Sequence, residues 1–538
     1  MSRYGWTATL IILGLFAVGF TWTSSDDLYA NIRIFDKAAL TVSSSYVEQV
    51  DEDELIKAAI DGMVSKLDHF SKFLAGPDYL NLIQETDGEF EGIGVSLEFH
   101  HDTLTIESVL DGTPAYYHGL KTGDRIIAIE GRSTISMESS NIKSLFRGPK
   151  DTVIRLKVLR PNDGIYNFSI ARDIVEVKSI SYYGMVDGLV GYARLARFSE
   201  GCSNDLANAI REMKREGMQS LILDLRDNPG GLLIEAVKVA SLFLPEGDVI
   251  VNTRGRAKDF LQTYKSDGEP DFQTGALAII VNGQTASAAE ILAGAIQDHD
   301  RGVIIGSSSF GKGLIQQVLQ LSEESALKLT TSKYYLPSGR CLQRPDWSSS
   351  GLIETQQSER DSIFTTVSGR LVFGAGGILP DIYIDAPLVS DYVEFLKKDA
   401  CFFDFSLEFV KGHVVTAGFQ VDDSILADFR RFVLSRDLGY QDDQRMAYTK
   451  LRESLKAPGP NLKNALNSID RELALSEQWQ FESHFGEIRT ELLEAILLRA
   501  LGEGALYRYV YMPTHPEVAE ALLILTDMSK YNRILASN

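Results

Sequence analysis

The segment Ser220-Leu-Ile-Leu-Asp-Leu-Arg-Asp-Asn-Pro-Gly-Gly231 decides the fold class of this chain. A continuous apolar run that ends in a glycine-rich turn is typical of a strand that is buried on both faces and leads into a site. The pattern predicts a helix over 232–243 and a second buried strand over 276–282; upstream it predicts a strand over 191–198 and a helix over 203–216. Strands that alternate with helices indicate an α/β core.

The second strand leads into Asn282-Gly-Gln-Thr-Ala-Ser-Ala-Ala-Glu290, where small residues surround Ser287 and an alanine-rich helix begins. A hydroxyl at this place lies near a helix N-terminus, where free N–H groups and the helix dipole stabilise a developing oxyanion. A serine or threonine near a helix start is more often an N-cap, and Thr285 is the better candidate for that role.

Five motifs together resemble the active-site region of C-terminal processing (tail-specific) peptidases, and the resemblance covers about 47–384. The motifs are Asn282-x-x-Thr-Ala-Ser-Ala-Ala-Glu290, Ser309-Phe-Gly-Lys-Gly-x-x-Gln316, Asp224-Leu-Arg-x-Asn-Pro-Gly-Gly231, Tyr335-Leu-Pro-Ser-Gly-Arg340 and Gly376-Gly-Ile-Leu-Pro-Asp381. The resemblance implies a protease core like that of ClpP and crotonase, with Ser287 as nucleophile, Lys312 as general base and Gln316 as its neighbour. Thr285 stands where the family pattern has a serine.

The chemistry of a Ser-Lys pair agrees with these residues. An amine accepts the serine proton only when it is neutral, so the pKa of Lys312 must lie well below the ~10.4 of a free lysine. Burial without a paired carboxylate lowers it in this way. If 312–321 is a strand, Lys312, Leu314 and Gln316 face one way, and Gln316 orients the amine without charging it.

For the oxyanion hole we expect the backbone N–H of Ala288 together with that of Gly230 or Gly231. Glu290 follows the nucleophile by one helical turn, and it is either a supporting contact of the site or a solvated, capping carboxylate. His299 stands between two aspartates, but we expect it to end the alanine-rich helix and not to complete a Ser-His-Asp triad.

Short strands and glycine-rich turns from 87 onward predict a small β-barrel inserted ahead of the core. Gly112-Thr-Pro-Ala115, Gly119-Leu-Lys-Thr-Gly-Asp-Arg-Ile126 and Ile129-Glu-Gly131 resemble a bacterial PDZ domain over about 90–172. In that resemblance Gly92, Ile93, Gly94 and Val95 turn their N–H groups towards a peptide carboxylate, and the next strand accepts the peptide by β-augmentation. The partners implied are protein substrates with unstructured C-termini.

The first residues predict export. An uncharged stretch follows Arg3 from Trp6 to Trp22, long enough for a membrane anchor and also compatible with a cleaved signal peptide. The expected location is periplasmic or on the inner membrane facing the periplasm, with membrane attachment if the segment is uncleaved. The amphipathic helical pattern of 28–82 forms an arm that packs on a neighbouring domain or drives homo-oligomer formation.

Composition excludes several classes of function. The formal charge of -21 disfavours nucleic acid as a partner. The 3 cysteines are far apart, which favours buried thiols over one disulfide, and the 8 histidines have no metal-ligand spacing. We therefore expect neither a metal nor another cofactor.

The sequence thus predicts an α/β fold with an inserted PDZ barrel and an appended helical C-terminal domain. The predicted segments are 1–24 for the signal or anchor, 25–86 for the arm, 87–173 for the PDZ domain, 174–386 for the serine peptidase core and 387–538 for the helical domain. That last domain is a lid, a dimer arm, a partner platform or, as we favour, a stabilising flank. Alternative functions are a catalytically silent PDZ scaffold or holdase and a crotonase-like acyl-CoA enzyme.

Overall fold

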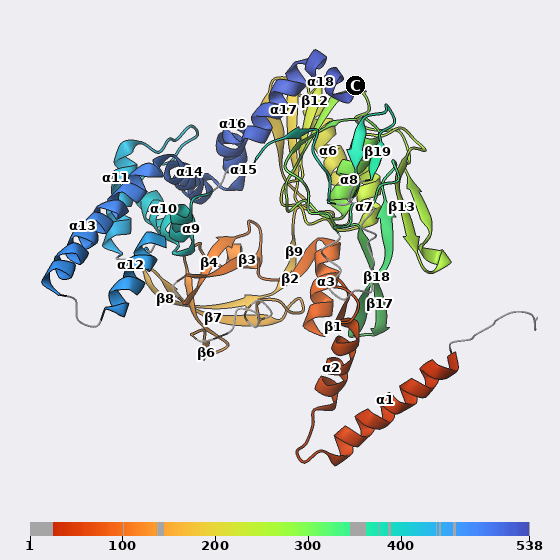
Figure 1. Ribbon diagram of the computed structural model, residues 1–538, viewed down its shortest axis with the longest axis horizontal. Coiled ribbons are helices and arrows are strands. Elements are labelled where there is room, and N and C mark those ends of the chain that lie inside the picture. Colours follow the sequence, from red (N-terminus) through yellow and green to blue (C-terminus); the bar gives the residue numbers. More distant parts are fainter. Residues whose placement is uncertain are drawn as a thin grey trace, which may run out of the picture.

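A computed structural model gives the fold of the chain (Figure 1). It describes residues 25–100, 102–135, 137, 142, 145–344, 362–374, 376–385, 389–436, 438–440, 443–455 and 459–536. The predicted signal or anchor, 1–24, lies outside the described residues. Within the described residues, no helix has the length and apolar character needed to cross a membrane.

The core sheet is built as the sequence predicts. Its strands are β10 (Ile180–Asp187), β11 (Val190–Leu195), β12 (Ser220–Asp224), β15 (Ala276–Val281), β16 (Val303–Gly306) and β21 (Ile382–Tyr383), in that spatial order. Only the β10–β11 pair is antiparallel among these neighbours. Every residue of β12 and β15 is buried, which confirms that both strands are covered on both faces.

Two groups of helices from distant parts of the sequence cover the two faces of this sheet. Leu221, Leu223 and Ile279 pack with one group, which consists of α6 (Cys202–Arg215), α7 (Leu233–Ser241) and α8 (Ala288–Asp298). Ile222 and Ile280 pack on the other face with the group formed by η4 (Tyr507–Tyr511), α16 (Met512–Thr514), α17 (Pro516–Thr526) and α18 (Met528–Leu535). The end of the predicted helical domain therefore supplies one layer of the α/β core.

A second sheet stands beside the core. It is formed by β1 (Lys72–Ala75), β18 (Ser325–Tyr335), β13 (Val249–Gly255) and β14 (Gln262–Lys265), with β17 (Leu314–Ser322) paired to β18. The arm that precedes the barrel contains the helices α1 (Ser25–Ser45), α2 (Glu52–Val64) and α3 (Pro77–Asp87). The arm is thus not wholly helical, because β1 pairs with β18 and ties it to the core.

The inserted barrel has the strand order β3-β4-β5-β7-β8, with β6 paired to β5. Its strands are β3 (Val95–His100), β4 (Thr103–Val109), β5 (Arg125–Ile129), β6 (Arg132–Ser133), β7 (Val153–Arg160) and β8 (Gly164–Ala171), with the short helix α4 (Pro114–Tyr117). The strands β2 (Glu89–Gly92) and β9 (Asp173–Glu176) pair where the chain enters and leaves the barrel. β3 therefore lies at one edge of the barrel sheet.

Helices of the C-terminal region form a bundle beside the barrel, and α15 (Glu503–Leu506) leads from this bundle back towards the core (Figure 1). The other helices of the bundle are α9 (Asp391–Lys398), α10 (Cys401–Gly412), α11 (Asp423–Ser435), α12 (Asp443–Ser454), α13 (Pro460–Ser483) and α14 (Phe485–Leu501). Arg499 of the bundle pairs with Glu107 of β4 at 2.9 Å, and the rings of Phe403 and His100 lie 4.5 Å apart. The C-terminal region therefore touches both the barrel and the core.

All three cysteines are buried thiols, which confirms the expectation: they are Cys202, Cys341 and Cys401.

The packing of α17 on the core sheet predicts a stability difference between two neighbouring residues. Ile524 is fully buried and Leu523 is 61% exposed. We expect Ile524→Ala to lower the free energy of unfolding by about 2–5 kcal/mol, because it leaves a cavity against the sheet. Leu523→Ala is the control and should cost less than about 0.5 kcal/mol. Urea denaturation of both variants measures the difference, and equal stabilities would contradict the assigned packing.

Candidate active site

Ser287 occupies the N-cap of α8, with φ of 56° and ψ of −115°. Residues other than glycine rarely adopt this backbone conformation, and such strain is concentrated at functional sites. The expectation that Thr285 caps the helix is wrong. Thr285 is fully buried, and its hydroxyl donates to the Leu225 carbonyl at 2.8 Å and accepts from the Asn282 N–H at 2.9 Å. Thr285 therefore holds the loop that precedes α8 in place, and Ser287 is the residue that caps the N-terminus of this helix.

The Glu290 carboxylate lies at the centre of the site and is fully buried. Its Oε2 accepts from the backbone N–H of Ser287 at 2.8 Å and from that of Lys312 at 3.0 Å. Its Oε1 accepts from the Gly311 N–H at 2.7 Å and from the Ser309 hydroxyl at 2.5 Å. Burial raises the pKa of Glu290, and these hydrogen bonds counter that shift. Both expectations are met in part: Glu290 caps the start of α8 through the Ser287 N–H, and the same carboxylate, buried and not solvated, supports the loop of Gly311 and Lys312.

The Lys312 side chain lies in the same region and is half-buried. Burial lowers the pKa of its amine to about 8, and the cation of Lys328 acts in the same direction, whereas Glu290 and Asp68 act against it. Its Nζ lies 4.7 Å from the ring centre of Phe70, which belongs to the N-terminal arm. An amine with this pKa is partly neutral near pH 8, as a general base requires.

The expected strand from Lys312 begins two residues later, because β17 starts at Leu314. Lys312 instead lies in the loop before β17, and two hydrogen bonds hold its backbone. Its N–H donates to Glu290, and its carbonyl accepts from the Tyr334 hydroxyl. The side-chain amide of Gln316 donates to Thr330 Oγ1 at 3.2 Å. Lys312, Leu314 and Gln316 nevertheless line one groove with Ser287.

The glycine-rich turn after β12 lies directly against Ser287. A methyl group on Gly230 would stand 2.9 Å from both Ser287 Cβ and the Ala288 nitrogen, so only glycine fits there. The N–H of Gly230 donates to Asn228 Oδ1 at 2.8 Å. Of the two glycines expected to donate in the oxyanion hole, Gly230 therefore already has an acceptor within the protein. Gly231 is exposed to the groove, so it is the better placed of the pair.

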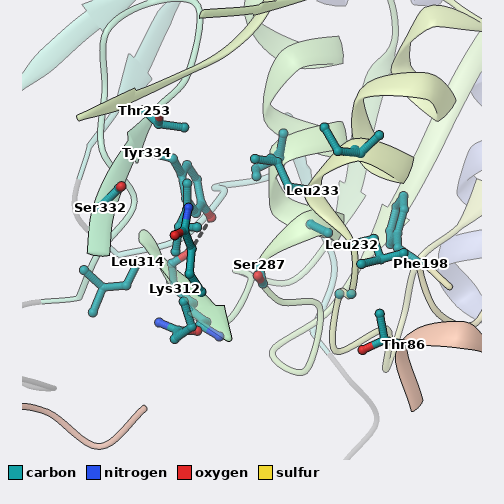
Figure 2. A pocket seen from close by; sticks show the side chains of 18 of the residues that line it. Thr86, Phe198, Leu232, Leu233, Thr253, Ser287, Lys312, Leu314, Ser332 and Tyr334 are labelled. Atoms are coloured by element: carbon teal, nitrogen blue, oxygen red, sulfur yellow. Dashed lines mark hydrogen bonds between the residues drawn. The ribbon is translucent and has the colours of Figure 1, made fainter. Parts of the chain in front are cut away.

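The groove that contains these residues has a volume of about 630 Å³. Figure 2 shows Ser287 between Lys312 on one side and the apolar side chains of Phe198 and Leu232 on the other. Leu233 and Leu314 add further apolar surface to the lining. The groove therefore offers a reacting centre beside space for apolar side chains of a peptide.

His299 is the C-cap of α8, at the opposite end of the helix from Ser287. Its Nε2 lies 2.7 Å from the Val249 carbonyl. The expectation that this histidine ends the helix is confirmed.

The glycine loop of the barrel has the features expected before a peptide-binding strand. The Ile93 carbonyl accepts from the Ala115 N–H at 2.8 Å, and the Gly94 carbonyl accepts from the Leu110 N–H at 3.0 Å. Gly94 has φ of 82°, and a methyl group there would stand 2.4 Å from Thr113. Gly92 ends β2 and Val95 begins the edge strand β3. These hydrogen bonds hold the loop in place, and the loop leads into β3, the edge strand of the barrel sheet. Peptide binding by β-augmentation requires such an edge strand.

Comparisons with known proteins agree with this geometry. Residues 189–349 match the family model of peptidase family S41, and residues 105–160 match that of the PDZ domain. Residues 22–75 match the N-terminal domain of the activating protease CtpB, and residues 392–525 match the C-terminal helical domain of a probable PDZ-protease. A carboxy-terminal-processing protease of Bartonella bacilliformis is 35% identical over 342 residues, which are 63% of this chain and 77% of that protein. This chain belongs to peptidase family S41.

Other relatives of this S41 peptidase are more distant. A probable CtpA-like serine protease of Staphylococcus aureus is 32% identical over 315 residues, which are 58% of this chain and 63% of that protein. The solved photosystem II D1 C-terminal processing protease shares 23% identity, with a TM-score of 0.37 over 66% of this chain and 92% of that one.

The family assignment makes the chain a serine-type peptidase of the carboxy-terminal-processing group, with an inserted PDZ domain and a C-terminal helical domain. The acyl-CoA alternative is thereby set aside.

Several residues of the site carry no local signal in the sequence. Asn228 belongs to a motif, but its sequence position does not show its contacts: its side-chain NH₂ donates to the Leu195 carbonyl at 2.7 Å, and its backbone carbonyl accepts from the Ala286 N–H at 2.9 Å. Asp68 and Phe70 come from the arm, and Asp68 accepts from Thr330 Oγ1 at 3.1 Å. The roles of these residues depend on contacts between segments that are distant in the sequence. The spacing of apolar residues along the chain does not predict such contacts.

The four donors around Glu290 predict the effect of one substitution. In Glu290→Gln, an NH₂ group replaces one of the two carboxylate oxygens. This NH₂ group then faces N–H or O–H groups that also donate, and each buried donor left without an acceptor destabilises the site by about 1–3 kcal/mol. We expect labelling of Ser287 by a fluorophosphonate to slow by about tenfold or more. Glu246→Gln, at an exposed turn, is the matched control and should label at the wild-type rate. Equal rates in the two variants would contradict this role of Glu290.

Proposed function

We propose that this S41 peptidase cleaves peptide bonds through an acyl-enzyme, with Ser287 as nucleophile and Lys312 as general base. The observation that carries the proposal is the Glu290 carboxylate, whose single oxygen Oε2 accepts from the backbone N–H of both residues. The lowered pKa of the Lys312 amine supports it further.

In the proposed reaction the neutral Lys312 amine takes the Ser287 hydroxyl proton as Oγ attacks the scissile carbonyl. The negative charge of the tetrahedral intermediate is stabilised by the N–H groups of Ala288 and Gly231. The Lys312 ammonium then gives its proton to the departing amine, which leaves the acyl-enzyme. Water enters, Lys312 accepts one of its protons, and the resulting hydroxide attacks the ester carbonyl. The Lys312 ammonium returns that proton to Ser287 Oγ as the ester C–O bond breaks, which releases the carboxyl product and restores the Ser287 hydroxyl and the neutral amine. Gln316, in the same groove, completes the lining on the side of Lys312.

The proposed substrates are proteins with unstructured C-termini. The rigid loop of Gly92, Ile93 and Gly94 and the edge strand that begins at Val95 support binding of a terminal carboxylate and strand addition by the peptide. An exported location, periplasmic or at the inner membrane, belongs to the same proposal, with 1–24 as signal or anchor. Self-association is also proposed, because α1 exposes apolar side chains that include Leu28, Ile34 and Leu40.

Degradation of an unfolded reporter with a free apolar C-terminus tests the dyad and the substrate class together. We expect the wild type to cleave it and both Ser287→Ala and Lys312→Ala to lose at least about 10³-fold in kcat, because each removes a group that reacts directly. A reporter with a charged C-terminal tag should be spared. Binding without cleavage by the wild type would support the silent scaffold instead, and full activity of Lys312→Ala would exclude the assigned base.

The pH profile tests the base separately. The Lys312 amine acts only when neutral, so kcat/KM should rise tenfold per pH unit below a pKa of about 8 and level off above it. His299→Ala is the control and should leave this limb unchanged, since His299 caps the far end of α8. A profile that is flat between pH 6 and 9 would argue against a titrating lysine base.

A further inference from the structure

We propose that His515 and Glu517, at the start of α17, are positioning residues for the peptidase reaction, because they hold the Arg226 guanidinium next to the oxyanion turn. This inference rests on the proposed role of Gly231. It gives the C-terminal helical region a part in catalysis, where the sequence favoured only a stabilising flank.

The N–H groups of Arg226 donate to two sets of acceptors, which lie at different edges of its guanidinium group. On one side Nη2 donates to Asp224 Oδ2 at 2.6 Å and Nε to Asp224 Oδ1 at 3.1 Å. On the other side Nη1 donates to His515 Nδ1 at 2.6 Å and to Glu517 Oε2 at 3.2 Å. The Arg226 side chain is only 8% exposed. A buried guanidinium needs hydrogen-bond acceptors for its N–H groups. Asp224 accepts from Nε and Nη2, and His515 and Glu517 provide the acceptors for Nη1.

The acceptor role requires a neutral imidazole with its Nδ1 lone pair free. Burial lowers the pKa of His515 to about 4, and the charge of Arg226 acts in the same direction. His515 is therefore neutral at neutral pH and accepts the hydrogen bond from Arg226.

Arg226 is followed at once by the turn that faces the nucleophile. Asp227 has φ of 58°, its N–H donates to Asn282 Oδ1 at 3.0 Å, and Asn282 Nδ2 donates back to Asp227 Oδ1 at 2.8 Å. The Asn228 carbonyl accepts from the Ala286 N–H. The turn is thus bonded to the loop that precedes Ser287, and a shift of Arg226 is passed to the position of Gly231.

α17 is well suited to hold Arg226 in place. Its buried face consists of Val518, Ala521 and Ile524, each with no exposed surface, and it packs on β12 and β15. The helix is therefore fixed to the same strand, β12, that ends at Asp224, the other partner of Arg226. The acceptors at its start are held at a defined distance from the turn.

The test measures kcat and KM of the full chain on a fluorogenic peptide with an apolar C-terminus. We expect His515→Leu to lower kcat about 10- to 100-fold with KM within about twofold, because a displaced oxyanion donor weakens only the transition state. His515→Asn places an amide oxygen near the position of Nδ1 and should recover most of the loss. Glu517→Gln should lower kcat about threefold or more.

Glu520→Gln is the matched control, because Glu520 lies on the same helix but pairs with Lys530 at 2.6 Å and not with Arg226. It should keep the wild-type kcat, and thermal unfolding should show all variants folded at the assay temperature. If His515→Leu does not stay folded, the Glu517→Gln and Glu520→Gln pair decides the question.

Three outcomes would overturn the inference: a kcat for Glu517→Gln equal to that of Glu520→Gln, an asparagine variant as impaired as the leucine variant, or a loss that appears in KM alone. Ser287→Ala and Lys312→Ala are assayed beside these variants. Activity that survives in either of them would refute the proposed dyad, which is a failure distinct from that of the positioning role.

Discussion

A single buried carboxylate holds the two halves of the active site together. Glu290 binds the backbone of Ser287 on one side and the backbone of Gly311 and Lys312 on the other. A carboxylate without solvent contact is costly unless hydrogen bonds replace water, and here four donors do so. Because three of these donors are backbone N–H groups, the bond network fixes the main chain and leaves the side chains of Ser287 and Lys312 free to face the groove.

The lysine beside this carboxylate depends on regions well outside the peptidase core. Phe70 of the arm lies over the Lys312 amine, and Asp68 binds Thr330 beside Gln316. Phe70 therefore contributes to the exclusion of water that lowers the pKa of Lys312, whereas the charge of Asp68 acts against that lowering. Residues from the arm and from the second sheet thus meet at Lys312.

Much of the core could be predicted from the sequence, and particular residues show where prediction ends. The runs 220–224 and 276–281 are apolar at every position except Ser220 and Asp224, and such a pattern has few solutions other than a strand covered on both faces. The identity of the covering layer was not predictable, because the apolar face of α17 is compatible with any partner. The cap at Ser287 and the start of β17 at Leu314 depend on strained or loop backbone, which propensity does not describe. The choice between Gly230 and Gly231 depends on the hydrogen bond that the Gly230 N–H donates to Asn228 Oδ1, which no spacing in the sequence reveals.

The outer layer of the core sheet has a consequence for the order in which the enzyme is made. Synthesis runs from the N-terminus, so Ser287 and Lys312 leave the ribosome long before η4, α17 and α18. Until those helices arrive, Ile222 and Ile280 lack their cover, and Leu277 lacks the Tyr531 hydroxyl that accepts from its N–H at 3.1 Å. A nascent or truncated chain thus carries Ser287 and Lys312 on an incomplete scaffold. The core sheet receives its second covering layer only when translation has passed these last helices.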